Sequence, residues 1–208
     1  ARLQPQRVVY AEGGHPSMMK AAVQAKAEGI CFPILLGNPD RINRQAQRLK
    51  LDLSGIKIID MRADKEQGRR ATYAKHLAEK LARKGYTFQE AYDKMYERNY
   101  FGMMMVERGD ADAFITGLYT KYSNTIKVAT EVVGVREGFH TFGTMHVVNS
   151  QKGTYFIADT LINRHPDNNF LVDIARLSAN TVEFFNEKPV MAMISYSNFG
   201  TDEIGSPL

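Results

Sequence analysis

The sequence predicts an α/β fold in which helices cover both faces of a parallel sheet, a three-layer α/β/α arrangement. Short apolar runs alternate with amphipathic helical patterns over the first part of the chain, as strands and crossover helices do in parallel sheets. Later, two alternating runs flank a short turn, which indicates an antiparallel hairpin. We therefore expect an α/β/α domain at residues 1–128 and a partial second domain with antiparallel strands at residues 129–208.

The first two units each join a strand to a helix. Residues 7–12 are predicted as a strand, and a Gly-Gly-His-Pro turn leads to a helix that Ser17 is placed to cap and that ends before Gly29. The apolar run 30–36 is the second strand. A basic helix follows it, with apolar residues at helical spacing on one face. These residues are Ile42, Ala46 and Leu49.

The third strand is expected at residues 56–59, followed by a charged loop and another amphipathic helix. Gly85 ends that helix, and Thr87 is placed to cap a longer one whose apolar spacing continues to Phe101. The three consecutive methionines at 103–105 would point in different directions on a helix. We therefore interpret them as core residues instead of soft metal ligands.

A fourth strand at Ala113–Ile115 is followed by a polar loop and a helix that Ser123 and Asn124 are placed to cap. The amide groups and positive dipole end of such a helix would lie over the carboxyl end of the strand, where an anion is stabilised. An ordinary connection with a well-capped helix explains the same stretch. The candidate anion-binding residues are Thr116, Ser123, Asn124, Thr125 and Lys127.

The second half predicts a hairpin around the turn 149–153, then a helix from about Phe170 to Phe185 that Asp167 caps. The apolar run 189–194 is expected to be a buried strand. The loop after it has hydroxyl, amide and glycine groups suited to wrap an anion, as the loop after the fourth strand has. Its candidate ligand-binding residues are Ser195, Ser197, Asn198 and Gly200.

Composition and charge indicate a globular protein that binds small anions. Of 208 residues, 44% are hydrophobic and 24% charged, as in average globular domains. The net charge of +4 is modest and its lysines and arginines are scattered, which disfavours nucleic acid as a partner. The single cysteine, Cys31, lies in an apolar run and indicates a reducing compartment, so we expect a cytoplasmic location. No run is long enough for a membrane span, and we expect the chain to be part of a longer one.

The sequence contains no motif typical of a nucleotide fingerprint, a metal site or a nucleophile. Neither the glycine-rich dinucleotide motif nor the P-loop occurs, and the histidines lack metal-ligand spacing. Ser195 and Ser197 lack the nucleophile elbow, which favours hydrogen bonding to a ligand. Arg83 ends a helix, where it either suits the helix dipole or reaches a phosphate from the edge of a cleft. We predict no metal and no catalytic residue.

Five blocks of the sequence carry a resemblance: Arg83–Thr87, Met104–Asp112, Gly117 with Ser123–Lys127, Phe156–Asp159 and Met193–Gly200. In this order they are similar to blocks of phosphate acetyltransferases and butyryltransferases. The sequence of the last block, together with Ala11–Gly13, most resembles the acetyltransferase-like domain at the carboxyl end of bacterial hybrid NADP-dependent malic enzymes. The resemblance implies a two-domain architecture like that of isopropylmalate and isocitrate dehydrogenases, here incomplete at its carboxyl end. It also implies a site for coenzyme A and acyl phosphate in the cleft between domains.

The chain departs from this family at three places. Lys127 stands where the active transferases have arginine, which keeps the charge but loses bidentate binding. Asp202 stands where a small residue is usual, and the family's catalytic serine, arginine and aspartate belong to a segment beyond Leu208.

Two functions follow from the resemblance and its departures. The first is a regulatory and oligomerisation domain of an NADP-dependent malic enzyme, binding acetyl-CoA or a related anion and forming at least a dimer. This fragment would bind no cofactor, since NADP, Mg²⁺ or Mn²⁺ and the oxidative decarboxylation of malate to pyruvate would belong to a preceding domain. The second is an active phosphate acyltransferase that exchanges an acyl group between coenzyme A and phosphate. A third, an NADP-binding oxidoreductase fragment, is disfavoured by the missing glycine fingerprint.

Overall fold

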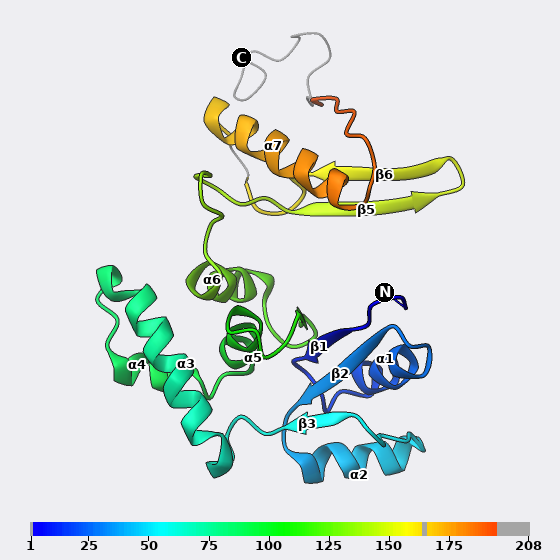
Figure 1. The fold of residues 1–208 in the computed structure, drawn as a ribbon, viewed down its shortest axis with the longest axis vertical. Helices are drawn as coiled ribbons and strands as arrows, with labels where there is room; N and C mark the ends of the chain where they lie inside the picture. The colour runs from blue at the N-terminus through cyan, green and yellow to red at the C-terminus, as the bar shows by residue number, and fades with distance from the viewer. Residues whose placement is uncertain (1, 164–165, 195–208) are drawn as a thin grey trace. The chain divides into compact units, whose positions relative to one another are not determined.

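The computed structural model describes residues 2–163 and 166–194, and the chain divides into two compact units after Gly134. The first unit is built on a four-stranded sheet with the strand order β3-β2-β1-β4 (Figure 1). All neighbouring strands pair in parallel. The strands are β1 (Gln6–Tyr10), β2 (Cys31–Leu36), β3 (Lys57–Ile59) and β4 (Ala113–Ile115).

Two helices cover one face of this sheet. They are α1 (Pro16–Ala27) and α2 (Pro39–Leu49), each following a strand. Because side chains alternate along a strand, Tyr10 and Leu35 point to this face, where they pack with Met19 of α1 and Ile42 of α2. Cys31 is buried in the same cluster, as a small apolar residue is expected to be.

The opposite face carries the larger core. Val9, Leu36 and Ile59 contribute to it from the strands, together with fully buried helix residues such as Phe101 and Leu77. Its helices are α3 (Gln67–Lys80), α4 (Phe88–Lys94), α5 (Arg98–Glu107) and α6 (Tyr122–Val132), with the short 3₁₀ turns η1 (Asp64–Glu66) and η2 (Ala82–Lys84). The methionines at 103–105 are buried in this core. Helices therefore lie on both faces of a parallel sheet, which confirms the predicted α/β/α class.

The predicted cap of the first helix and the predicted length of the helix after Thr87 are both corrected. His15, not Ser17, occupies the N-cap of α1, and its Nδ1 accepts from the Ser17 amide at 3.2 Å. Proline at the first helical position explains this shift, since its fixed φ suits that place. The single helix expected after Thr87 is two helices, because Glu97 adopts an extended backbone between α4 and α5.

The α6 helix begins at Tyr122, so neither Ser123 nor Asn124 is its cap. Lys121 occupies the N-cap position without a side-chain cap bond, and its carbonyl accepts from the amides of Asn124 and Thr125. A capping side chain acts from an extended residue that precedes the helix. Ser123 and Asn124 already lie in the first helical turn.

The predicted cap at Thr87 is confirmed as a capping box, and we expect Thr87→Ala to cost about 1 kcal/mol of unfolding free energy. Thr87 Oγ1 accepts from the Glu90 amide at 3.2 Å, while Glu90 Oε2 accepts from the Thr87 amide at 2.8 Å. Urea unfolding measures the effect. Thr72→Ala is the control, because that hydroxyl only donates to the Gly68 carbonyl within α3. Equal losses in the two variants would contradict a role for the cap.

The second unit contains the predicted antiparallel hairpin and one long helix. The strands β5 (Met145–Ser150) and β6 (Gly153–Ala158) pair with Met145 opposite Ala158, and α7 (Asn168–Phe184) follows. Asp167 caps α7 as expected, since its carboxylate accepts from the Phe170 amide at 2.7 Å. Residues 189–194 form no strand, which corrects that prediction. No neighbouring strand of the described residues pairs with them, and Val190 and Ile194 are about nine-tenths exposed.

The first unit extends to Gly134, beyond the boundary expected at Val128. Val128 lies inside α6, and Val132 at the end of that helix is fully buried in the larger core. Lys80 of α3 also donates to the Val132 and Val133 carbonyls, which ties the end of α6 to the first unit.

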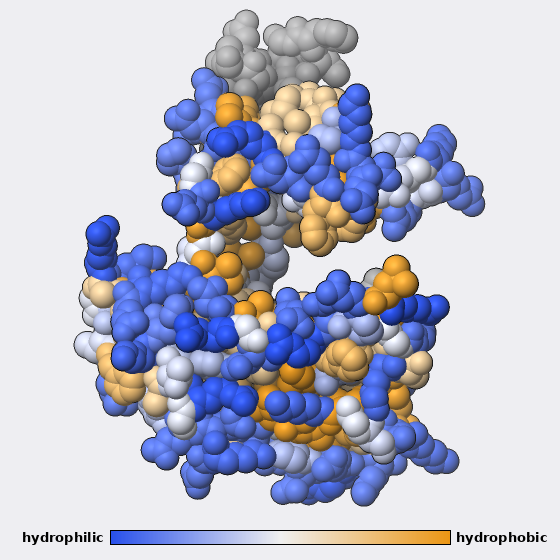
Figure 2. All heavy atoms as spheres, viewed as in Figure 1, coloured by the Kyte–Doolittle hydropathy of each residue, from blue (hydrophilic) through white to orange (hydrophobic). Residues whose placement is uncertain are grey.

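On the face of the first unit seen in Figure 2, hydrophilic atoms predominate around an area of apolar atoms. None of the helices in the described part of the chain combines the length and apolar character that a membrane span requires.

Candidate ligand-binding site

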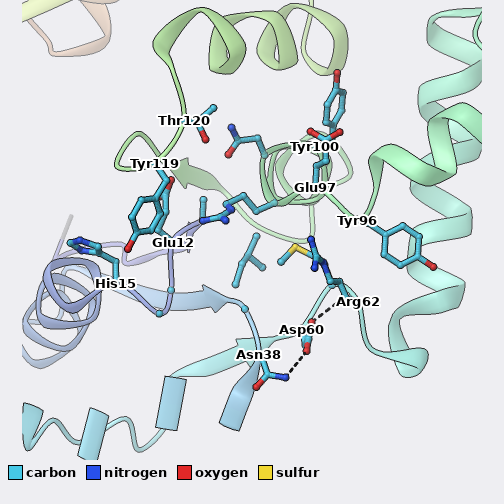
Figure 3. Close-up of a pocket in the computed structure, with 18 of the residues that line it drawn as sticks. Glu12, His15, Asn38, Asp60, Arg62, Tyr96, Glu97, Tyr100, Tyr119 and Thr120 are labelled. Atoms are coloured by element: carbon cyan, nitrogen blue, oxygen red, sulfur yellow. Dashed lines mark hydrogen bonds between the residues drawn. The ribbon is translucent and has the colours of Figure 1, made fainter. Parts of the chain in front are cut away.

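A cavity of about 990 Å³ opens at the carboxyl edge of the parallel sheet (Figure 3). Its walls include Glu12 after β1, Asn38 after β2 and Asp60 after β3. Thr120 and three α6 residues join them from the segment after β4. Because parallel strands all point one way, the loops that follow them meet at one edge, where open α/β sheets bind ligands. The volume is also that of a pocket for a small molecule.

The strand order places a topological switch point between β1 and β4. The chain proceeds from β1 to β2 and β3 on one side and places β4 on the other. Glu12 follows β1 and Thr116 follows β4, and Thr116 Oγ1 donates to Glu12 Oε1 at 3.1 Å. The Gly117 amide donates to the same oxygen at 3.4 Å. The two loops at the switch point are therefore joined through one buried carboxylate, which is 2% exposed.

Basic side chains outnumber acidic ones in the cavity wall. The basic residues are Arg41, Arg62, Lys94, Arg98 and Lys127, and the acidic residues are Glu12, Asp60 and Glu97. Within the described part of the chain, the guanidinium groups of Arg41 and Arg62 have no carboxylate within ion-pair distance. Unpaired cations that line a concave surface raise its positive potential, so the cavity is suited to attract anions.

A hydrogen-bonded network around Glu131 supports the wall that α5 and α6 form. Tyr100 Oη donates to Glu131 Oε2 at 2.6 Å, and Lys94 Nζ donates to the Tyr100 oxygen at 3.1 Å. Burial, followed by the hydrogen bond with Glu131, raises the pKa of Tyr100. Lys127 Nζ lies 3.9 Å from Glu131 Oε1, and its side chain is 66% exposed. Lys127 is therefore held weakly and remains accessible to a ligand.

Arg70 of α3 fixes the backbone segment that follows β3. Its Nη1 donates to the carbonyls of Met61 and Ala63 at 2.7 and 2.8 Å, and the residue is 3% exposed. The guanidinium also lies 4.6 Å from the centroid of the Tyr96 ring. This segment contains Arg62, so Arg70 positions one of the cavity's cations without lining the cavity itself.

An exposed aromatic ring lies at the cavity wall. Tyr119 is 66% exposed, and the Arg98 guanidinium lies 5.7 Å from its ring centroid. The imidazole of His15 meets the same ring edge-on at 5.4 Å (Figure 3). These contacts hold the apolar ring of Tyr119 next to the charged side chains of the cavity wall.

The candidates from the sequence are only partly brought together. Asn124 and Lys127 line the cavity. Thr116 does not line it, but its hydroxyl donates to Glu12, which does. Ser123 and Thr125 share the first turn of α6 but are absent from the cavity wall, as is the exposed Arg83 in η2. The remaining candidates lie outside the described residues; these are Ser195, Ser197, Asn198 and Gly200.

Several residues of the cavity wall were not predicted from the sequence. Glu12, Arg62 and Arg98 are separated along the chain; Glu12 lies in the Ala11–Gly13 stretch that carries part of the resemblance, whereas Arg62 and Arg98 belong to no such block. Glu12 follows the first strand and Arg62 follows the third, so the rule that ligands bind beyond strand ends was a signal for both. Arg98 had no such signal, because the break between α4 and α5 was not predicted. In the described part of the chain, no three histidine, cysteine or acidic side chains lie close enough to hold a metal ion.

Comparisons with known proteins agree with the fold. The family profile described as Phosphate acetyl/butaryl transferase matches residues 1–206. The NADP-dependent malic enzyme of Escherichia coli is 33% identical over 99% of this chain and 27% of its own length, and the Bacillus subtilis phosphate acetyltransferase is 30% identical over 94% and 59%. The structure of the EutD phosphotransacetylase from Staphylococcus aureus superposes with a TM-score of 0.82 at 27% identity, over 96% of this chain and 59% of that one. The chain thus spans about a quarter of the first enzyme's length and three-fifths of the other two.

Proposed function

The chain belongs to the phosphate acetyl/butaryl transferase family, and from this premise we propose that it binds acetyl-CoA or a related anion in the cavity at the sheet's carboxyl edge. The observation that carries the proposal is the excess of basic side chains there, at the β1/β4 switch point. The nucleotide end of acyl-CoA carries several phosphate charges, and a long uncharged polar arm joins it to the acyl group. The unpaired Arg41 and Arg62 supply charge for the phosphates.

We propose further that the chain acts as a regulatory and oligomerisation domain of an NADP-dependent malic enzyme, with acetyl-CoA as effector. Similarity to malic enzymes over almost the whole chain supports this role. Lys127 supports it as well, because the resemblance implies an arginine at this position in active transferases, and lysine cannot bind a phosphate through two parallel bonds. NADP, the divalent metal and the decarboxylation of malate would belong to another part of that enzyme.

Activity as a phosphate acyltransferase is the second candidate, and similarity to enzymes of that name supports it as directly. The two candidates share the cavity and its ligand. They separate on turnover, since only the transferase would form acetyl phosphate from acetyl-CoA and inorganic phosphate.

Titration calorimetry with acetyl-CoA tests the proposed binding. We expect Lys127→Ala to weaken acetyl-CoA binding by about tenfold, the value of one hydrogen bond to a charged group. The loss should be larger at low salt, because salt screens exposed charges. Lys20→Ala is the matched control: Lys20 is an exposed lysine of α1 outside the cavity wall, and its removal changes the net charge equally. Equal affinities in the two variants would place the ligand elsewhere.

A further inference from the structure

One oxygen of the buried Glu12 carboxylate has no partner. Oε1 accepts from Thr116 and from the Gly117 amide, whereas Oε2 is buried and makes no hydrogen bond to any described residue. Glu12 nevertheless belongs to the wall of the cavity that the basic residues line (Figure 3). An unsatisfied buried carboxylate oxygen is costly, so it requires an explanation such as a ligand that donates to it.

The surroundings of Glu12 keep its carboxylate in place. Thr116 Oγ1 lies between Glu12 Oε1 and Asn99 Oδ1, at 3.1 and 3.0 Å, and donates its single proton to one of them at a time. Asn99 is 5% exposed and belongs to the start of α5, so α5 is linked to the carboxylate only through Thr116. The carboxylate itself is held through Oε1 by the segment that follows β4, which restricts where Oε2 can lie.

A fixed carboxylate in a cavity that attracts anions makes the cavity selective for some anions over others. It repels a fully deprotonated anion, whose oxygens are all acceptors, and it accepts a hydrogen bond from an anion that carries a donor. The same cavity therefore distinguishes two anions of equal charge and similar shape.

We infer that Glu12 accepts a hydrogen bond from a donor on the bound anion and so selects donor-bearing anions over fully deprotonated ones. This inference rests on the proposed function, because it assumes that the cavity holds an anion. The donor is either the P–OH of a hydrogen phosphate group or an N–H or O–H group on the arm of coenzyme A. In both cases Glu12 determines specificity, while the basic residues supply affinity.

Sulfate, inorganic phosphate and coenzyme A test the inference at mildly alkaline pH, each titrated into the purified chain. There phosphate and sulfate are both tetrahedral dianions, but only phosphate keeps a proton to donate. We expect the wild type to bind phosphate about tenfold more tightly than sulfate, as one hydrogen bond to a charged group implies. Glu12→Gln replaces the free acceptor with an amide and should bring the phosphate-to-sulfate ratio close to one.

Glu79→Gln is the matched control, since Glu79 is an exposed carboxylate of α3 outside the cavity wall and its replacement changes the net charge equally. It should leave the ratio unchanged. If Glu12→Gln does not fold, Glu12→Asp keeps the charge but withdraws the carboxylate by one methylene, and the ratio should again fall.

The outcomes distinguish the two sources of the donor. They also distinguish failure of the inference about Glu12 from failure of the proposed function. A lowered phosphate-to-sulfate ratio in Glu12→Gln identifies the P–OH as donor. Weaker binding of coenzyme A alone identifies a donor on its arm. If the wild type binds coenzyme A but Glu12→Gln changes none of the three affinities, or weakens all three equally, the inference about Glu12 is overturned and the proposed function stands. If the wild type binds none of the three, both are overturned.

Discussion

Replacing Gly13 with alanine is expected to destabilise the protein by about 3 kcal/mol, through overpacking against a backbone that has no room to move. A methyl group at Gly13 would lie 2.7 Å from the Leu36 carbonyl oxygen, 2.9 Å from the Leu36 amide and 2.8 Å from Leu35 Cβ. These atoms belong to β2, a central strand paired on both sides. The Gly13 amide also donates to the Leu36 carbonyl at 3.2 Å, and this bond would be broken if the loop after β1 were pushed away from β2.

Thermal unfolding measures this effect, and a loss of that size should lower Tm by about 6–12 °C in a chain of this length. The adjacent glycine provides the control. A methyl group at Gly14 would have Ile42 Cγ1 at 3.9 Å as its nearest neighbour, which is an ordinary contact. Gly14→Ala should change the unfolding free energy by less than about 0.5 kcal/mol. A similar Tm for the two variants would show that β2 yields to the added methyl group.

Arg70→Met is expected to cost about 2–4 kcal/mol, because it leaves the Met61 and Ala63 carbonyls without their donor. Methionine matches the length of the arginine stem, so lost packing contributes little. The freed segment contains Arg62 of the cavity wall. Acetyl-CoA binding should therefore weaken as well, even though Arg70 does not line the cavity. Urea unfolding and calorimetric titration on the same preparation measure the two effects.

Arg69→Met is the control for Arg70, since it removes the same charge one residue earlier. Arg69 is 30% exposed and lies 3.1 Å from Glu66 and 3.9 Å from Asp110. The Glu66 side chain is only 11% exposed, so loss of this pair should cost more than the roughly 1 kcal/mol of an exposed ion pair. Arg69 holds no part of the cavity wall, so acetyl-CoA affinity should stay unchanged. If Arg69→Met reduced stability and ligand affinity as much as Arg70→Met, the role assigned to the two carbonyl bonds would be wrong.

The sequence by itself determined the elements whose signals are local. The apolar runs that became β1, β2 and β4 are short and bounded by turn residues, and the hairpin follows from two alternating runs around a tight turn. Thr87 and Asp167 were identified as caps because the residues they serve lie three positions away. The run at 189–194 has the same local signal as a strand, but it has no pairing partner in the described part of the chain.

The tertiary structure alone decided which residues form the cavity. Glu12 meets Thr116 across 104 positions of sequence, and Asn99 meets Thr116 across 17. The polar loop before α6 was recognised in the sequence, but its partners lie in loops after other strands and at the start of α5. Strand order brings these segments together. It is fixed by the packing of both sheet faces, a property of the whole unit that no single stretch of sequence carries.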